Sequence, residues 1–353
     1  MASTNRDARS RVGNFSRWSN MKDKTSRQIV SLSEMTAGQE ADLFALLAAK
    51  EELTTRDGKP YFKVSFRDHA REVSFPIWQD SPWGAECREA WQAGEFYKLR
   101  AVFRETSFGP QLDIRKIRPV VEADSAEGFC PAMCLPQSRY EPEGMFDQLL
   151  SVVNDIRTTA LKSLVIDVLT PHRDALLTLP AATHNHHAYA GGFLEHVLSV
   201  TRTCQYLADK YAEMYDDLEP PFARDLVIAG GALHDIGKLL EIEQHATGAE
   251  YTASGSLIGH LVQGRDIVRE AAGRHELPGD MLLRLEHIIL SHQRLPEWGS
   301  PKPPMTPEAL LVHYADDIDA KLQMMIGALR EHRGPGPMTS KKNTLYQQVY
   351  KGS

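Results

Sequence analysis

The chain has 353 residues, a formal net charge of -7 at pH 7 and 42% hydrophobic residues. This length exceeds what one hydrophobic core usually supports, so two domains with tails are expected, and the composition excludes fibrous proteins and wholesale disorder. No apolar run approaches the roughly 18 residues of a membrane helix, and the start, MASTNRDARSRVGNF, lacks the apolar core of a signal peptide. We therefore expect a cytoplasmic protein without a membrane partner.

Charge is distributed unevenly along the chain. Residues 1–30 carry +5 and residues 330–353 carry +4, which leaves -16 on the body between them. Basic ends on an acidic body fit a metal enzyme that steers a polyanion with its tails and does chemistry with carboxylates. Basic tails that only aid solubility would give the same pattern, so charge alone leaves both interpretations open.

The cysteines favour reduced thiols. Four are present, which is too few and too scattered for a disulfide framework. Cys130 and Cys134 form a CxxxC pair, but no second Cys or His pair stands at the spacing of a zinc knuckle, so a structural zinc is not expected.

In chain order, residues 1–27 are polar and non-periodic, which predicts a flexible basic arm. Residues 28–120 predict two hairpins, one turning at 56–60 and one over 96–120 turning at 107–110. Between them stand a strand, REVSFPIW, and a short helix near 82–92. Three strands, a helix and two strands is the order of a five-stranded OB-like β-barrel.

Such barrels bind single strands of nucleic acid with aromatic platforms and basic grooves. Aromatic and basic residues alternate along the expected strands, although half of the aromatics must face the barrel core because strand residues alternate in and out. The candidates for contact with single-stranded RNA or DNA are Tyr61, Lys63, Phe66, Arg67, Arg104 and Arg115.

The rest of the chain is predicted to be helical. Residues 121–143 are rich in Pro and acids and are interpreted as a linker. Residues 144–330 predict an all-α domain, followed by a basic tail over 331–353. Its helices are expected at 145–169, 193–214, 222–234, 257–273, 280–292 and 307–328.

Histidines and aspartates stand on the apolar faces of these helices. His234-Asp235 ends one apolar helix, and Gly237 is expected to let that helix stop so that both side chains converge on one divalent cation. An unpaired polar group on such a face costs about 1–3 kcal/mol, so a shared metal site explains the set better than separate buried histidines do. The remaining candidate ligands are His196, His260, His292 and Asp316.

The order His196, His234-Asp235, Asp316 resembles the HD phosphohydrolase superfamily. The phrases HNHHAYAGGFLEHVLSV and AGGALHDIGKLLEI look like the YhaM family of 3′-5′ exoribonucleases, which joins an N-terminal OB domain to an HD domain. The resemblance covers residues 30–330 and implies a hydrolase that shortens single-stranded RNA, and also DNA, to nucleoside 5′-monophosphates. It implies Mn²⁺ as the metal, with Fe²⁺, Co²⁺ or Mg²⁺ as alternatives.

The resemblance also implies roles for individual residues. His196, His234, Asp235 and Asp316 would form the main metal site, and His260 and His292 would complete a second one, with the catalytic Asp235 as the bridge. Gln293 stands where the family phrase has a second histidine, which would weaken the second site.

Other residues near the motifs are assigned by chemistry. Lys238 could reach a phosphate oxygen, with a solvated lysine after a helix end as the alternative. His186 and His187 could contact the substrate or donate a proton to the leaving 3′-oxygen, with loop residues of no function as the alternative. Of the carboxylates at the C-terminal motif, only Asp316 is expected to point at the metal. Four further histidines are interpreted as surface or packing residues: His245, His275, His287 and His313.

Two rival functions remain open. An HD enzyme acting on nucleotides or cyclic dinucleotides would use the barrel for regulation or oligomer contacts. A non-catalytic nucleic-acid-binding protein would carry a decayed HD domain. The sequence does not decide the native metal, the cellular substrate or whether the chain forms a homo-oligomer.

Overall fold

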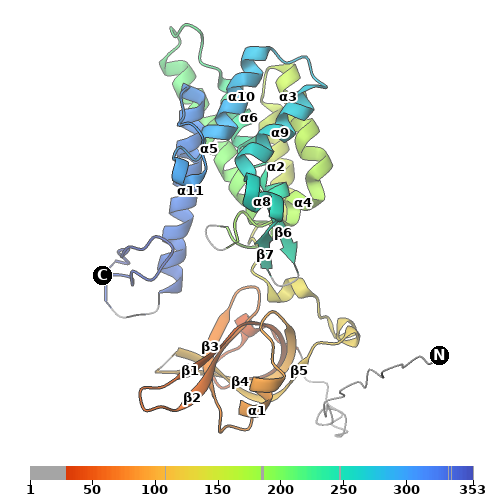
Figure 1. Cartoon of the computed structure of the whole chain (residues 1–353), viewed down its shortest axis with the longest axis vertical. Coiled ribbons are helices and arrows are strands. Elements are labelled where there is room, and N and C mark those ends of the chain that lie inside the picture. The colour runs from red at the N-terminus through yellow and green to blue at the C-terminus, as the bar shows by residue number, and fades with distance from the viewer. Residues whose placement is uncertain are drawn as a thin grey trace, which may run out of the picture. The chain divides into compact units, whose positions relative to one another are not determined.

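The computed structural model describes residues 29–107, 109–183, 187–245, 248–332, 334 and 336–352 (Figure 1). The basic arm expected over residues 1–27 lies outside these ranges. The chain divides into two compact units, Met1–Cys134 and Leu135–Ser353, each with its own hydrophobic core. None of the described helices is long and apolar enough to cross a membrane.

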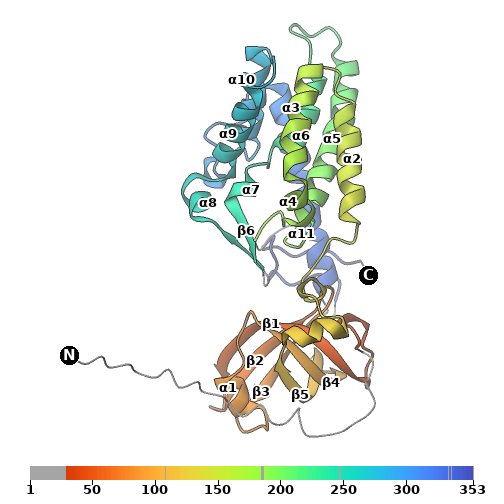
Figure 2. The same ribbon diagram turned by 90° about the vertical axis from the view of Figure 1, so that its right-hand side faces the viewer.

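The first unit is a five-stranded antiparallel barrel with the strand order β3-β2-β1-β4-β5. Strands β3 and β5 are in contact, which closes the sheet on itself, as the ring of strands in Figures 1 and 2 shows. The expected order of three strands, a helix and two strands is confirmed. The elements are β1 (Glu40–Thr54), β2 (Pro60–Arg67), β3 (Glu72–Trp78), α1 (Gly84–Glu89), β4 (Phe96–Thr106) and β5 (Gly109–Pro119).

Alternation along β2 decides which of its side chains reach solvent. Phe62, Val64 and Phe66 are at most 2% exposed and point into the barrel, whereas Lys63 is exposed. The Phe66 ring lies 6.0 Å from that of Trp91, in the middle of the core. The prediction that Phe66 contacts nucleic acid is therefore wrong, because the two-residue period of the strand places it inside.

The segment predicted to be a linker, residues 121–143, begins with two 3-10 turns, η2 (Glu122–Glu127) and η3 (Pro131–Cys134). Asp124 is 1% exposed and accepts hydrogen bonds of 2.7 and 2.6 Å from the guanidinium of Arg118. The amide nitrogen of His69 donates to the carbonyl oxygen of Met133. These contacts attach the first part of the segment to the barrel unit.

The second unit is all-helical apart from a small hairpin, β6 (Ile242–His245) and β7 (Gly248–Tyr251), which the sequence did not predict. Its main helices follow the predicted positions. In the described part of the chain they are α2 (Pro142–Asn154), α3 (Thr159–Leu169), α4 (Arg173–Thr178), α5 (Gly192–Met214), α6 (Arg224–Leu233), α7 (Lys238–Glu241), α8 (Ala253–Ile258), α9 (His260–Ala272), α10 (Gly279–Ser291) and α11 (Pro307–Glu331).

One predicted helix, over residues 145–169, is two helices in the structure. The chain breaks between α2 and α3, where the carboxylate of Asp225 accepts hydrogen bonds of 2.8 Å from both the amide and the hydroxyl of Thr158. A distant side chain thus satisfies the first free amide groups of α3, which sequence periodicity cannot reveal.

Helix α6 lies at the centre of the unit, surrounded by α5, α10 and α11 (Figure 2). Eight of its ten residues are buried, so it is apolar all round as a central helix must be. Gly230 allows this close packing, since a Cβ there would lie 2.7 Å from the Ile288 side chain and 3.1 Å from that of Val312. Helix α6 therefore places the two residues that follow it, His234 and Asp235, in the interior of the unit.

Candidate metal centre

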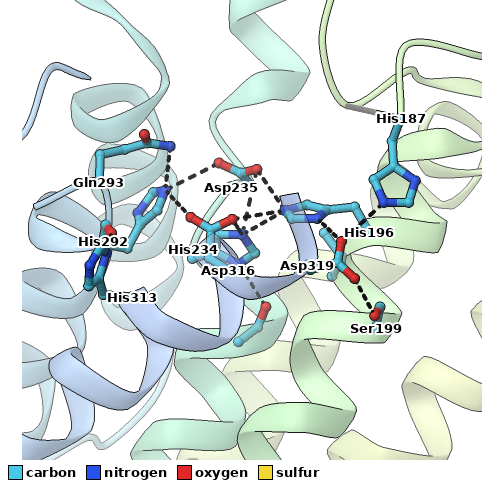
Figure 3. A network of polar contacts seen from close by, with 12 residues as sticks. His187, His196, Ser199, His234, Asp235, His292, Gln293, His313, Asp316 and Asp319 are labelled. Atoms are coloured by element: carbon cyan, nitrogen blue, oxygen red, sulfur yellow. Dashed lines mark hydrogen bonds and ion pairs between the residues drawn. The ribbon is translucent and has the colours of Figure 1, made fainter. Parts of the chain in front are cut away.

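Polar side chains from separate helices meet at one point inside the second unit (Figure 3). His196 comes from α5, the pair His234-Asp235 follows α6, His292 follows α10, and Asp316 comes from α11. All five side chains are buried, between 0% and 8% exposed. His260, at the start of α9, joins the same cluster. The residues predicted as metal ligands thus lie together.

One half of the cluster surrounds Oδ2 of Asp235. The Nε2 atoms of His196 and His234 lie 3.6 and 3.5 Å from this oxygen and 3.3 Å from each other. Oδ1 of Asp316 lies 3.3 Å from His196 Nε2 and 3.9 Å from His234 Nε2. Three or four ligand atoms at this spacing are typical of a site for one divalent cation.

The other half surrounds Oδ1 of the same carboxylate. The Nε2 atoms of His260 and His292 each lie 3.4 Å from Oδ1 of Asp235. Oδ2 of Asp316 lies 4.0 Å from His292 Nε2. Asp235 therefore stands between two pairs of imidazoles, and its two oxygens face different pairs.

The hydrogen-bonding pattern tests whether these residues fit a metal ion. Asp235 Oδ1 and His260 Nε2 are buried, and among the described residues neither has a hydrogen-bond partner. Leaving buried polar atoms without partners costs about 1–3 kcal/mol each, and native proteins seldom do so without a functional reason. The two orphaned atoms lie in the second half of the cluster, so the ligand set fits a cation there.

Hydrogen bonds on the far side of the rings fix the histidine tautomers. The Nδ1 atoms of His234 and His292 donate to backbone carbonyl oxygens of Gly231 and Ile289, both at 2.9 Å. His260 Nδ1 donates to Glu241 at 2.9 Å. Because a carbonyl or carboxylate oxygen only accepts, each Nδ1 carries the proton, and each Nε2 presents a lone pair to the cluster.

The electrostatics of the cluster favour a bound cation. Burial lowers the pKa of His234 to about 4, so this ring is neutral near pH 7, as a metal ligand must be. Burial would raise the pKa of the Asp235 carboxyl, but Lys238 and the histidines hold it well below its usual range. Lys238 is buried with its Nζ 2.7 Å from Asp235 Oδ2. The ammonium of Lys238 balances one of the two buried carboxylates, Asp235 and Asp316, which face the imidazoles.

A comparison with known families bears on this part of the chain. Residues 193–321 match the family model of the HD domain. The match includes every residue of the cluster just described and indicates a metal-dependent phosphohydrolase superfamily. The clusters of histidine and aspartate are compatible with divalent metal ions.

Three similar solved structures each cover 26–28% of this chain. They include a domain of replication protein A from Methanococcus maripaludis (9% identity, 26% of this chain and 94% of that chain, TM-score 0.21). They also include the second OB-fold domain of the same protein (13%, 27% and 96%, 0.21) and an OB domain from Methanosarcina mazei (20%, 28% and 88%, 0.22). The description of the first unit as an OB-like barrel rests on its own strand order and closure.

Asp319 is a residue of the HD domain that the sequence reasoning missed. Its carboxylate accepts hydrogen bonds from His196 Nδ1 at 2.8 Å and from His187 Nε2 at 3.0 Å, and from the hydroxyl of Ser199. We predicted that only Asp316 points at the metal. Asp317 is 38% exposed, and Asp319 contacts the Nδ1 side of His196, whereas Asp316 contacts its Nε2 side. Asp319 follows Asp316 by three positions, which puts both on one helix face, and this spacing was visible in the sequence.

The remaining predicted residues of the HD domain lie in different places. His187 contacts Asp319, whereas His186 lies outside the described residues. Gln293 Nε2 is 3.3 Å from His292 Nε2, at the edge of the second half of the cluster. Lys238 is not a solvated lysine after a helix end, because it is 6% exposed and paired with Asp235.

The role expected of Gly237 needs correction. Its φ of -64° is an ordinary helical value, so backbone freedom at this glycine does not end α6. A Cβ at Gly237 would instead lie 2.0 Å from the carbonyl oxygen of His260. The glycine is required for the close approach of α9, which brings His260 to the cluster.

The barrel presents some of its predicted contact residues on one outer face. Tyr61 pairs in register with Trp78, their ring centroids are 5.2 Å apart, and Lys63 is the next outward residue of β2. Between β3 and β5 a groove of about 420 Å³ is lined by Trp78, Arg104 and Arg115, among others. Arg67 ends β2 and is half-buried.

Proposed function

We propose that the chain is a metal-dependent 3′-5′ exonuclease of the YhaM type that hydrolyses single-stranded RNA, and also DNA, to nucleoside 5′-monophosphates. The observation that carries the proposal is the position of Asp235 between two pairs of imidazoles. Paired cation sites that share a carboxylate suit the displacement of one phosphate oxygen by another, since the attacking and leaving oxygens both need charge stabilisation.

Divalent ions held here would supply Lewis-acid chemistry and lower the pKa of a water molecule toward neutrality. We propose Mn²⁺ first, with Fe²⁺ and Co²⁺ as alternatives, because four imidazoles beside two carboxylates disfavour the harder Mg²⁺. The protein holds four Nε2 lone pairs in place through Nδ1 hydrogen bonds, and Lys238 balances part of the charge of Asp235.

His187 is proposed to contact the substrate. It is 4% exposed, and its two ring nitrogens lie against the hydroxyl of Tyr189 and the carboxylate of Asp319. Both partners hold the ring in one orientation beside two pockets, and one of them, Asp319, also contacts His196 of the cluster.

The exposed aromatic and basic residues of the barrel favour a polymeric substrate over a mononucleotide. Tyr61 and Trp78 offer π-faces on which bases can stack, and Lys63, Arg104 and Arg115 supply positive charge nearby. A hydrolase of mononucleotides has no need of such a face, which is why we place a nucleic acid strand ahead of a free nucleotide.

The deciding experiment uses protein stripped of metal and then loaded with Mn²⁺, incubated with single strands labelled at either end. A 5′ label should pass through a ladder of products shortened one nucleotide at a time, and a 3′ label should appear at once as a mononucleotide. An Asp235→Asn variant is the control for a contaminating nuclease. Turnover of a free nucleotide or cyclic dinucleotide by a protein that is inert toward every polymer would overturn the proposal in favour of the nucleotide phosphohydrolase. Failure to retain any divalent ion would favour the non-catalytic binding protein.

A further inference from the structure

Two pockets of the HD domain lie beside His187 and Asp319, and Asp319 contacts the Nδ1 side of the His196 ring. One has a volume of about 310 Å³ and the other of about 570 Å³. Both are bounded by the same four residues, namely Arg139, His187, Glu195 and Asp319. Arg330 of α11 lines the smaller pocket, and Arg202 of α5 lines the larger one. Three arginines from different parts of the unit therefore surround one opening.

These three arginines differ in their partners from others of the helical unit. Among the described residues, Arg139, Arg202 and Arg330 have no carboxylate oxygen within 4.0 Å. The Arg139 guanidinium donates to the hydroxyl of Tyr140 at 2.6 Å, and that of Arg202 donates to the amide oxygen of Gln148 at 2.7 Å. By contrast, six arginines of the unit are paired with acids: Arg173, Arg224, Arg265, Arg269, Arg274 and Arg284.

Two of the acids in the pockets are already engaged by other donors. The Glu195 carboxylate accepts hydrogen bonds from Ser138 at 2.7 Å and from Tyr189 at 3.0 Å. Asp319 accepts from two histidines and from Ser199. A third acid, Glu141, lines the larger pocket, so the three arginines outnumber the carboxylates that remain for them. A guanidinium is well suited to bind a phosphate with two parallel hydrogen bonds.

Helix α5 sets the distance between this charge and the cluster. It carries the ligand His196 and, six residues later, Arg202, a separation of about 9 Å along the helix axis. An anion held by Arg202 would thus lie beyond the phosphate at the cluster and not on it. Tyr140, which is 47% exposed and lies under the Arg139 guanidinium at 4.7 Å, adds a surface for a base.

We propose that Arg139, Arg202 and Arg330 form a rim that binds backbone phosphates of a single strand beyond the phosphate being cleaved. The substrate class of the site is then an oligonucleotide with at least one phosphodiester upstream of the scissile bond. This inference rests on the proposed exonuclease function and deepens it, because it assigns the recognition of a polymer to the HD domain itself.

The test compares the double variant Arg139→Ala, Arg202→Ala with a matched control, Arg274→Ala, which removes an exposed arginine paired with Asp167 outside both pockets. Two substrates are used with Mn²⁺-loaded full-length protein: a trinucleotide, and bis(p-nitrophenyl) phosphate, which has no upstream phosphate. The double variant should raise KM for the trinucleotide at least tenfold and leave turnover of the small diester within about twofold of wild type. The dependence of KM on salt should also become shallower. Arg202→Lys should restore part of the loss.

Two results would overturn the proposal that these arginines bind backbone phosphates. In the first, the double variant behaves toward the trinucleotide as the control does. In the second, it loses turnover of both substrates equally, which would assign the arginines to the structure of the site. A wild-type protein that cleaves the small diester but no trinucleotide would remove the exonuclease function itself, and the rim with it, so the two failures are distinguishable.

Discussion

The metal cluster and the barrel differ in how their buried carboxylates are satisfied. In the barrel, Asp42 accepts two hydrogen bonds from Arg100 and Asp124 accepts two from Arg118, so both carboxylates are matched by a guanidinium. In the cluster, Asp235 keeps one oxygen without a hydrogen-bond partner among the described residues, although its other oxygen is paired with Lys238. A matched pair stabilises the fold, whereas an unsatisfied carboxylate oxygen among several imidazoles suits a bound cation.

The largest effect is expected from breaking the cluster at α11. Asp316→Asn should lower Mn²⁺-dependent hydrolysis by at least about 1000-fold, because a neutral amide is a poor ligand for a divalent ion and the adjacent imidazoles lose their shared carboxylate. Bound metal, measured by elemental analysis, should fall in parallel.

The neighbouring residue provides a matched control for this change. Asp317→Asn alters the same charge one residue away, on a side chain that is 38% exposed and 3.9 Å from Lys321. It should leave activity and metal content within about twofold of wild type. Equal losses in the two variants would show that helix α11, and not the Asp316 carboxylate, is what the site requires.

Removing the metal should destabilise the helical unit and leave the stability of the barrel unchanged. At a free ion concentration 100 times Kd, binding contributes about 2.7 kcal/mol to the stability of the unit that holds the ion. Chelation should therefore speed hydrogen exchange in α5, α6, α10 and α11, which carry the ligands, and leave the barrel strands unchanged. Mass spectrometry of peptides from full-length protein reads both units in one experiment. Equal changes in barrel peptides would contradict the assignment of the metal to the helical unit.

The ion pair of Asp124 with Arg118 in the barrel should affect stability and leave metal binding unchanged. Asp124→Asn should cost roughly 2 kcal/mol of barrel stability, since a charged hydrogen-bond pair is broken, while metal content stays at the wild-type value. Hydrogen bonds from Arg118, against the cost of burial, hold the pKa of the Asp124 carboxyl below its ordinary 3.8. The contribution of this carboxylate is therefore complete above about pH 4 and is lost as the pH falls through the lower value of the folded state.

Hydrogen exchange of barrel peptides as a function of pH measures this effect. Wild type and the Asn variant should differ by a constant amount near pH 6 and converge in acid. A difference that grows as the pH falls would have the wrong sign for a carboxyl whose pKa is lowered by folding, and would rule out the pair with Arg118 as its cause.

Much of the fold could be predicted from short-range patterns. The Asp57-Gly58 turn and the two-residue alternation of β2 are local, so the first hairpin of the barrel follows from the sequence. The spacing of apolar residues likewise placed α5, α6 and α11 near their observed bounds. The break between α2 and α3 depends on Asp225, 67 residues away from Thr158, and no local pattern contains that contact.

In the candidate site, too, some residues could be predicted from local sequence patterns, and others depend on contacts between distant residues. His234 and Asp235 are adjacent in the sequence and were predicted as a pair, and the other residues of the cluster were predicted from polar residues on apolar faces; the structure places them together. The spacing of Asp319 from Asp316 was visible in the sequence, but its contact with His187, 132 residues earlier in the chain, was not. The arginine rim also required the structure, because an arginine without a counterion has the same letter as a paired one.

The smallest effect is expected on the outer face of the barrel, where neither kind of buried charge is involved. Trp78 is 40% exposed and its ring lies 5.2 Å from that of Tyr61. Trp78→Ala should weaken the binding of a single strand by about fivefold, near the lower end of what one base stacked on an aromatic ring contributes. Phe66→Leu is the control, because Phe66 is 0% exposed and its loss should lower barrel stability without changing the affinity of the folded protein. Fluorescence anisotropy of a labelled strand, with Ca²⁺ in place of Mn²⁺ to prevent hydrolysis, measures both affinities. If the two variants weakened binding equally, the strand would be sensing the integrity of the barrel and not its outer face, and recognition of the polymer would then fall to the HD domain alone.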